Sequence, residues 1–115
     1  MLVTTTDTIE GKTIETYHGI VSGEAIMGAN VVRDLFASVT DIVGGRSSSY
    51  ENKLSEGRQI ALEDMKVLAN KLGANVVIGI DLDFETIREG MMMCVATGTA
   101  VTYREDVLIR SRKLL

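Results

Sequence analysis

The stretch "ANVVIGIDLDFETIREGMMMCVATGTAVTY", Ala74 to Tyr103, decides the fold of this chain. Its first part, Val76 to Ile80, is continuously apolar, which is typical of a strand covered on both faces. From Ile80 to Glu85 apolar and acidic residues alternate, as in a strand with one solvated face. The residues "REG" indicate a turn, and Met91 to Tyr103 indicate a returning strand. The stretch therefore predicts an antiparallel hairpin.

The residues near the N-terminus predict one long strand followed by a helix. Thr8 to Ile26 is dense in Thr, Ile, Val and Tyr, which favour a strand, and Gly19 or Gly23 is where we expect an irregularity. From Ala29 the apolar residues recur at spacings of three and four. This period is typical of an amphipathic helix, for which Asn30 is a suitable cap.

A second and longer helix is predicted from Ser48 to about Leu72. Ser48 and Glu51 have the spacing of a capping box, and Gly73 stands where a left-handed C-cap glycine belongs. The expected apolar stripe of this helix consists of Leu54, Ala61, Met65, Leu68 and Leu72. The order strand, helix, helix, hairpin predicts an α+β fold, in which a long helix packs on one face of an antiparallel sheet as a two-layer sandwich.

Length and composition limit the class of protein. The 115 residues fit one domain, residues 1–115, in which residues 104–115 form a tail that either docks on a neighbour or frays. Aromatic residues make up only 4% of the chain, so the core must be aliphatic, and self-association is one way to bury more of it. The net charge of -4 argues against a nucleic-acid partner.

The location that we expect is the cytoplasm. The single cysteine cannot form an intramolecular disulfide, which argues against a secreted disulfide scaffold. The first 15 residues lack the pattern of a signal peptide, and no apolar stretch approaches the length that spans a bilayer. The sequence therefore predicts a cytoplasmic protein without a membrane partner.

Three segments together resemble a known family. They are "GANVVRDLFASVTDIVGGRSSSYENKL", "LGANVVIGIDLDFE" and "GMMMCVATGTAVTY", in this order and spacing. They resemble the YbjQ-like family of small uncharacterised bacterial proteins, which carries the label of a heavy-metal-binding domain. The resemblance implies a compact α+β subunit that assembles into a ring-shaped homo-oligomer, with a pentamer as the expected form. It also implies a metal ion as the candidate cofactor, and it implies no established reaction.

The sulfur-rich part of the hairpin is the first candidate site. On a strand, Met92 and Cys94 share one face while Met91 and Met93 share the other, so only two sulfurs converge within one chain. Cu(I) usually takes two or three good ligands and Zn(II) takes four, and buried Met and Cys are common as packing residues. Packing is therefore the favoured interpretation. A ring axis would repeat Met92 and Cys94 in every subunit and would restore a metal site.

The acidic row Asp81, Asp83 and Glu85 is the second candidate. Alternate carboxylates on one strand face point together, and hard cations such as Mg²⁺ or Ca²⁺ bind clustered oxygen ligands. A solvated outer face explains the same pattern without an ion, and it is the interpretation that we favour.

The segment "GGRSSSY" is the third candidate, as a site for a small anion. Gly45, Arg46, Ser47 and Ser48 precede a predicted helix N-terminus, where free N–H groups attract anions. Arg46 can add a bidentate contact to a phosphate or carboxylate, or it can pair with an acidic residue across a subunit interface. Ordinary helix capping also accounts for Gly45 and Ser48.

Catalysis has little support in the sequence. His18 is the only histidine, and a Cys94–His18 pair would require adjacent strands in register. Three functional classes remain. The first is a noncatalytic ring-forming protein that binds a metal ion, as the resemblance implies. The second is a structural or interaction module, or a binder of small anions. The third and least favoured is an enzyme with a subunit-interface site.

Overall fold

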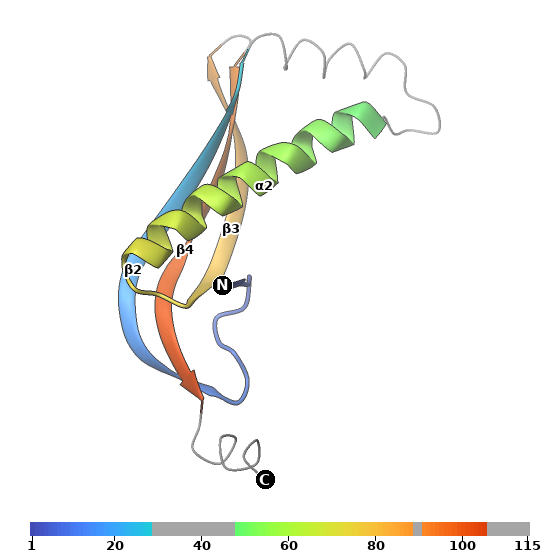
Figure 1. The fold of residues 1–115 in the computed structure, drawn as a ribbon. Coiled ribbons are helices and arrows are strands. Elements are labelled where there is room, and N and C mark those ends of the chain that lie inside the picture. Colours follow the sequence, from blue (N-terminus) through green and yellow to red (C-terminus); the bar gives the residue numbers. More distant parts are fainter. Residues whose placement is uncertain (29–47, 89–90, 106–115) are drawn as a thin grey trace.

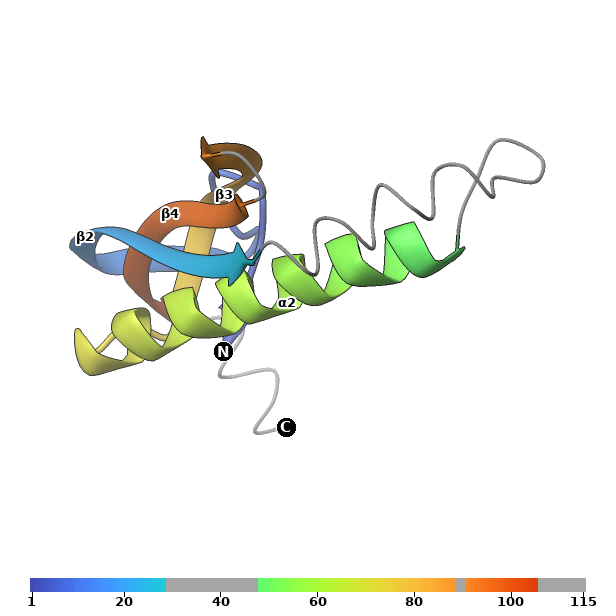
Figure 2. The ribbon, with the colours of Figure 1, turned by 90° about the horizontal axis from the view of Figure 1, so that it is seen from above.

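The computed structural model describes residues 1–28, 48–88 and 91–105, and these residues form one sheet and one helix (Figure 1). The strands are β1 (Leu2–Val3), β2 (Lys12–Met27), β3 (Val76–Arg88) and β4 (Met91–Glu105), and the helix is α2 (Ser48–Lys71). Viewed from above, α2 lies on one side of the strands (Figure 2). The α+β class and the helix layer are therefore confirmed. The helix predicted from Ala29, with its cap Asn30, lies outside the described residues.

The sheet has the strand order β1-β3-β4-β2. The pairs β2–β4 and β3–β4 are antiparallel, as predicted. The prediction of a wholly antiparallel sheet is wrong at one edge, because β1 pairs with β3 in parallel, with Leu2 opposite Val76 and Val3 opposite Val77. A strand of two residues is too short to show a period in the sequence, so β1 was not predictable from its pattern.

The predicted hairpin is confirmed as β3 and β4. Val76, Val77 and Ile78 are buried, as expected for a strand covered on both faces. After Ile78 the register shifts by one residue, and Gly79 absorbs the shift with a φ of 61°. A left-handed backbone of this kind favours glycine, because any Cβ would be strained there. Beyond the shift the apolar and acidic side chains alternate as predicted.

β2 begins at Lys12, so the predicted start at Thr8 is four residues early. Residues 4–11 instead run beside β3, where the N–H of Gly79 donates to the carbonyl of Thr6 at 2.9 Å. Ile9 packs on a small apolar cluster on the face of the sheet opposite α2, formed by Val76, Ile78, Val101 and Tyr103. This segment therefore covers the part of that face that lies near the start of β3 and the end of β4.

The irregularity predicted in β2 occurs at Gly19. The register with β4 shifts between Tyr17 and Gly19, and Gly19 has a φ of 115°. Gly23, the other predicted position, is regular in register but lies under α2. A Cβ on Gly23 would collide with backbone atoms of Ala61 and Met65. The missing side chain therefore lets the helix approach the strand closely.

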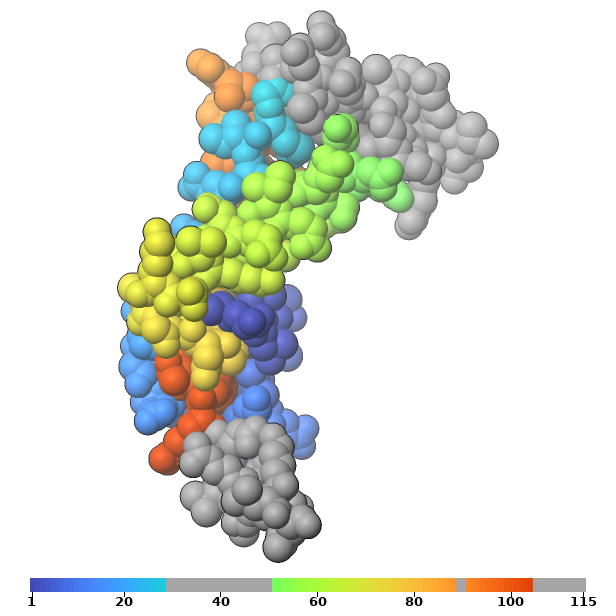
Figure 3. Space-filling view, in the orientation of Figure 1, coloured from blue at the N-terminus to red at the C-terminus, as the bar shows by residue number. Residues whose placement is uncertain are grey.

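The core lies between α2 and the sheet. The helix buries a stripe with a spacing of four residues: Gly57, Ala61, Met65 and Ala69. The predicted stripe is correct at Ala61 and Met65 and wrong at Leu68 and Leu72, which are 40% and 44% exposed. Apart from Met65, the buried residues of this stripe are small, which suits the close approach of α2 to the sheet at Gly23. Figure 3 shows α2 crossing this face of the molecule.

The C-terminus of α2 is capped as predicted. Gly73 has a φ of 90°, and the N–H of Ala74 donates to the carbonyl of Ala69 at 3.1 Å. This six-to-one hydrogen bond is that of a Schellman motif. The chain then enters β3 through Asn75, whose side chain bonds to both the N–H and the carbonyl of Tyr103. The cap and Asn75 together fix the hairpin under the helix.

Candidate functional site

The predicted sulfur site lies on the face of β4 that points toward α2. Cys94 is opposite Ala25 on one side and Phe84 on the other, and its side chain is fully buried in the core. Met92 is opposite Met27 on the same face. The predicted separation of the sulfurs by parity is confirmed. Cys94 therefore packs against the helix layer.

The environment of Cys94 favours its protonated form. Burial raises the pKa of the thiol, the nearby positive charge of Arg58 acts in the opposite direction, and the charge of Asp83 raises the pKa further. Metals bind the thiolate, so this environment works against ligation. Met91, on the other parity, accepts a hydrogen bond from Nε of Arg88 through its sulfur at 2.9 Å.

Among residues 1–28, 48–88 and 91–105, no three or more His, Cys, Asp or Glu side chains come together in a way that could hold a metal ion. Within the described residues one chain therefore offers no cluster of His, Cys, Asp and Glu ligands for a metal. Metal binding through Met92 and Cys94 stays a prediction.

The acidic row stands on the face of β3 that points away from α2. Asp81, Asp83 and Glu85 are all exposed. A side-chain hydrogen bond that protonated Asp83 donates to Asp81 raises the pKa of Asp83, and the charge of Asp81, desolvation and the charge of Glu85 raise it further. The three carboxylates therefore lie close enough to repel one another. Beside them β4 presents Thr97, Val95 and Met93, and cation binding at the row stays a prediction.

The predicted anion site is only partly within the described residues. Gly45, Arg46 and Ser47 lie outside them, and Ser48 is the first residue of α2. Because residue 47 lies outside the described part, the predicted start of the helix at Ser48 stays a prediction. Anion binding at this place stays a prediction.

His18 connects the irregular part of β2 to the end of α2. Its Nε2 lies 2.8 Å from Oγ1 of Thr102, and Thr102 donates to the carbonyl of Gly73 at 3.0 Å. Because the Thr102 hydroxyl has only one proton to give, Nε2 of His18 must be the donor in the first contact. The neutral ring therefore carries its proton on Nε2. This role is structural.

His18 does not meet Cys94. The two strands that carry them are adjacent, but Cys94 lies opposite Ala25, whereas His18 lies at the register shift near Val101 and Ala100. Seven residues of β2 separate the two levels, which is about 24 Å along a strand. The structure therefore does not assemble a nucleophile pair from these residues.

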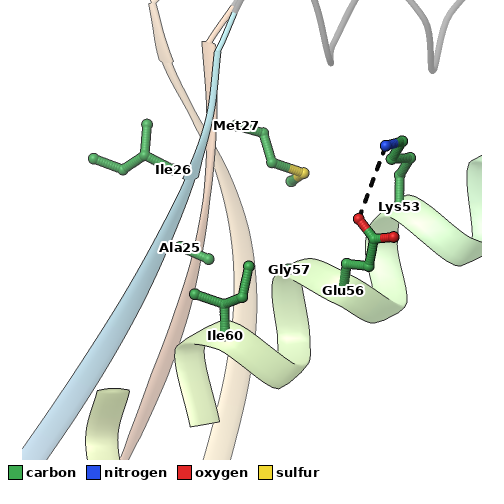
Figure 4. Close-up of a pocket in the computed structure, with 7 residues that line it drawn as sticks. All are labelled: Ala25, Ile26, Met27, Lys53, Glu56, Gly57 and Ile60. Carbon is green, nitrogen blue, oxygen red and sulfur yellow. Dashed lines mark ion pairs between the residues drawn. The ribbon is translucent and has the colours of Figure 1, made fainter. Parts of the chain in front are cut away.

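A pocket that the sequence did not predict opens between the end of β2 and the first half of α2 (Figure 4). Its volume is about 160 Å³, and it is lined by Ala25, Ile26, Met27, Lys53, Glu56, Gly57 and Ile60. Met27 points toward the helix, whereas Ile26 points away from it. Lys53 and Glu56 form an ion pair of 3.9 Å at the rim. Gly57, a glycine inside a helix, is the sequence signal that marks this close approach.

Both edges of the sheet are open over part of their length. Within the described residues β2 pairs only with β4, and β3 has a partner beyond β4 only near its start. Ile20 and Ile26 on β2 are 83% and 59% exposed. On β3, Phe84 and Ile87 are 36% and 46% exposed. The two open edges therefore carry apolar side chains in contact with solvent.

The fold and its candidate sites define a small α+β protein in which one long helix covers one face of a partly open, four-stranded sheet. No helix in the described part of the chain combines the length and apolar character needed to cross a membrane. Residues 1–104 match a family model, YbjQ_1, described as "Putative heavy-metal-binding". This chain belongs to that YbjQ-like family, as the resemblance in the sequence predicted.

Relatives with similar sequences carry the name of an uncharacterised family. A UPF0145 protein of Anoxybacillus flavithermus is 66% identical over 105 residues, which is 91% of this chain and all of the relative. A UPF0145 protein of Geobacillus kaustophilus is 69% identical over 101 residues, covering 88% of this chain and 96% of the relative.

The fold is similar to that of a solved structure. The crystal structure of a protein of unknown function of the DUF74 family, from Pediococcus pentosaceus, has a TM-score of 0.55 with this chain. The two share 16% sequence identity, and the match covers 90% of this chain and 98% of the other. At this identity the likeness concerns the fold alone.

Proposed function

We propose that this chain is a noncatalytic protein that works as a self-associating unit, with copies joined at the open edges of the sheet. The observation that carries the proposal is that, within the described residues, the outer edge of β2 has no partner strand and β3 has none from Asp81 to Arg88; on β2 the N–H of Glu24 is bound by Asp64 of α2. An unpaired strand edge presents free N–H and C=O groups that pair readily with another strand. Apolar side chains at the same edges add area that association would bury.

The composition of the core supports the same proposal. The largest fully buried side chains of the described residues are Met65, Val21, Val77, Val101 and Cys94, and none of them is aromatic. A core of small side chains contributes less burial per residue than one with Phe or Trp. Self-association would therefore supply stability that the single subunit lacks.

A contact between the two open edges is compatible with a closed ring. β2 and β3 are different surfaces, so a contact between them is heterologous, and such contacts generate either a ring or an open filament. The family resemblance supplies the pentamer as the expected size. A cytoplasmic location belongs to the same proposal, and its support is the single cysteine of the chain.

Native mass spectrometry of the purified protein tests the assembly directly. We expect one oligomeric species of defined size, and a monomer at micromolar concentration would overturn the proposal.

The edge is tested by Ser22→Pro, with Ser22→Ala as its matched control. Ser22 has the same parity as Glu24, whose N–H points to the open side of β2, so proline there removes a donor for the neighbour and none for β4. We expect only the proline variant to dissociate.

Heavy-metal binding is the second candidate function, and the description of the matching family favours it. Since the described residues of one chain do not converge as ligands, the metal would have to draw on donors from more than one subunit or from residues outside the described part. Soft ions such as Cu⁺ suit Met and Cys sulfur.

Elemental analysis of the protein as purified tests the metal directly, followed by equilibrium dialysis against Cu⁺ and Zn²⁺. Wild-type protein is compared with Cys94→Ser and Met92→Leu. A bound metal whose stoichiometry falls in both variants would support the predicted ligands. Unchanged stoichiometry would remove Cys94 and Met92 from any site, and no bound metal at all would leave self-association as the function.

A further inference from the structure

The face of the sheet that points away from α2, called the outer face here, is only partly covered. Its lower part lies under Ile9 of the N-terminal segment. In its upper part Ile26 is 59% exposed and points away from the helix (Figure 4), and its strand neighbours Met93 and Val95 are half-buried. The uncovered area is therefore apolar and lies next to the pairing of β2 with β4.

Acidic side chains border this apolar area. Asp81, Asp83 and Glu85 line it on β3, and Glu24 stands on β2 opposite Val95. The hydrogen bond with Asp81 and the negative charges of Asp81 and Glu85 raise the pKa of Asp83, so the carboxylates of this row repel one another. A ligand that combines apolar and basic side chains would cover the apolar area and relieve this repulsion.

One segment of the chain has this composition. Residues 106–115, "DVLIRSRKLL", contain three basic residues and one acidic residue, together with five apolar ones. The whole chain has 12 basic and 16 acidic residues, so the other 105 residues have nine basic against 15 acidic. The segment is thus opposite in charge to the rest of the chain. It also lies beyond residues 1–104, which match the family, so the shared fold does not depend on it.

The reach of the segment decides which copy of the chain it can serve. Arg110 is five residues beyond Glu105, so it lies within about 18 Å of it at full extension. Val95, which is opposite Asp83, lies ten residues before Glu105 and thus about 34 Å up the strand. Arg110 therefore cannot meet Asp83 of its own chain. Lys113, eight residues beyond Glu105, spans about 29 Å and reaches the level of Asp81, which is opposite Thr97. A contact in which Arg110, Arg112 and Lys113 lie along the row together therefore needs a second copy to provide the row.

We propose that the outer face binds residues 106–115 of a second copy of this chain. Their apolar residues cover Ile26, Met93 and Val95, and Arg110, Arg112 and Lys113 lie opposite the acidic row. The inference rests on the proposed self-association and adds to it a second contact, separate from the strand edges. It gives the acidic row a partner of opposite charge.

Zero-length cross-linking of the full-length protein with a carbodiimide tests the contact. The reagent joins the amine of Lys113 to a carboxylate within direct contact. A co-refolded mixture of equal amounts of ¹⁴N and ¹⁵N protein is cross-linked, digested and measured by mass spectrometry. We expect peptides that join Lys113 to Asp81, Asp83 or Glu85, with mixed isotope labels in about half of them, as random assortment of copies gives.

Two results would overturn the proposal. Cross-links with one isotope only would place the segment on its own chain, and the absence of any cross-link between Lys113 and the row would remove the contact altogether. The variant Arg110→Glu/Arg112→Glu keeps Lys113 available and should lower the cross-link yield by about fivefold or more, because it reverses the local charge. Lys71→Glu, a charge reversal on α2, is the matched control and should leave the yield unchanged.

Native mass spectrometry separates this contact from the proposed function. An oligomer of unchanged size in the Arg110→Glu/Arg112→Glu variant, with the cross-link lost, supports both proposals. An oligomer in the wild-type protein without any cross-link to the row overturns the contact and leaves edge-to-edge assembly standing. A wild-type monomer overturns both.

Discussion

The carboxylate of Asp64 on α2 accepts a hydrogen bond of 3.0 Å from the backbone N–H of Glu24 on β2. β2 is an edge strand, so this N–H would otherwise face solvent or an incoming strand. The contact lies next to Gly23, where the backbone of α2 comes closest to the sheet. Asp64 thus fastens the helix to the strand, and it restricts strand pairing along the middle of this edge.

Removing this contact should loosen the edge. We expect Asp64→Ala to lower the free energy of unfolding by about 1 kcal/mol, because an exposed hydrogen bond to a carboxylate is lost. Asp64→Asn keeps an acceptor oxygen and should lose less. Urea denaturation measures the stability, and hydrogen exchange of the Glu24 amide measures the contact itself. Unchanged exchange of that amide in Asp64→Ala would show that the contact does not protect it in solution.

Gly23→Ala should be the most damaging small substitution in β2. A Cβ at this position collides with backbone atoms of Ala61 and Met65, and backbone cannot move aside as a flexible side chain can. We expect a loss of about 3 kcal/mol of unfolding free energy, or a displaced helix. Gly28→Ala is the matched control, because nothing lies within 4 Å of its added Cβ. Equal stability of the two variants would contradict the close packing.

The parts of the fold that the sequence predicted are those with a regular period. The hairpin followed from the alternation after Ile80, and the end of α2 followed from Gly73. The buried stripe of α2 was predicted poorly, because the distance between helix and sheet decides whether Leu68 or Ala69 fits inside. That distance depends on Gly23, which lies on β2. The residue pattern of the helix alone therefore does not show how close the helix comes to the sheet.

The same distinction applies to the candidate sites: strand period predicted where their residues lie on a strand, but it did not predict contacts between elements. Strand parity correctly placed Cys94 and Met92 on one face and the acidic row on the other. Parity does not say which face meets the helix, and only the arrangement of the sheet and α2 places Met92 and Cys94 on the face toward the helix. The pocket beside Gly57 and the contact between Asp64 and Glu24 join residues far apart in the sequence. Only the arrangement of β2 against α2 brings them together.

Cys94 should behave as a packing residue in the folded protein. We expect Cys94→Ser to lower the free energy of unfolding by about 1–3 kcal/mol, because it places a hydroxyl in an apolar core. Cys94→Ala, the control, removes the sulfur without adding a polar group. In the wild-type protein the thiol should react with Ellman's reagent only as fast as the chain unfolds, since it is buried and its pKa is raised. Rapid labelling of the native protein would contradict this environment.

Asp83 should make stability depend on pH in a predictable direction. Its pKa in the folded chain is raised above the ordinary value of 3.8, chiefly by Asp81, so the folded state binds the proton more tightly than the unfolded state. The resulting stabilisation is fully present below 3.8 and is lost as the pH rises through the folded pKa. At neutral pH the charged row therefore destabilises the fold.

Asp83→Asn tests this directly, because it keeps the shape of the side chain and removes the charge. In the Arg110→Glu/Arg112→Glu background, which lacks the proposed basic partner of the row, we expect Asp83→Asn to raise the Tm at pH 7, with a difference that shrinks as the pH falls toward 3.8. Asp81→Asn should give the same trend, since repulsion between the two carboxylates is mutual. Thermal unfolding followed by circular dichroism across this range measures the effect. In the otherwise wild-type protein the proposed contact with residues 106–115 compensates the row, so there the gain should be smaller or reversed. A lower Tm for Asp83→Asn in the Arg110→Glu/Arg112→Glu background would contradict the repulsion within the row.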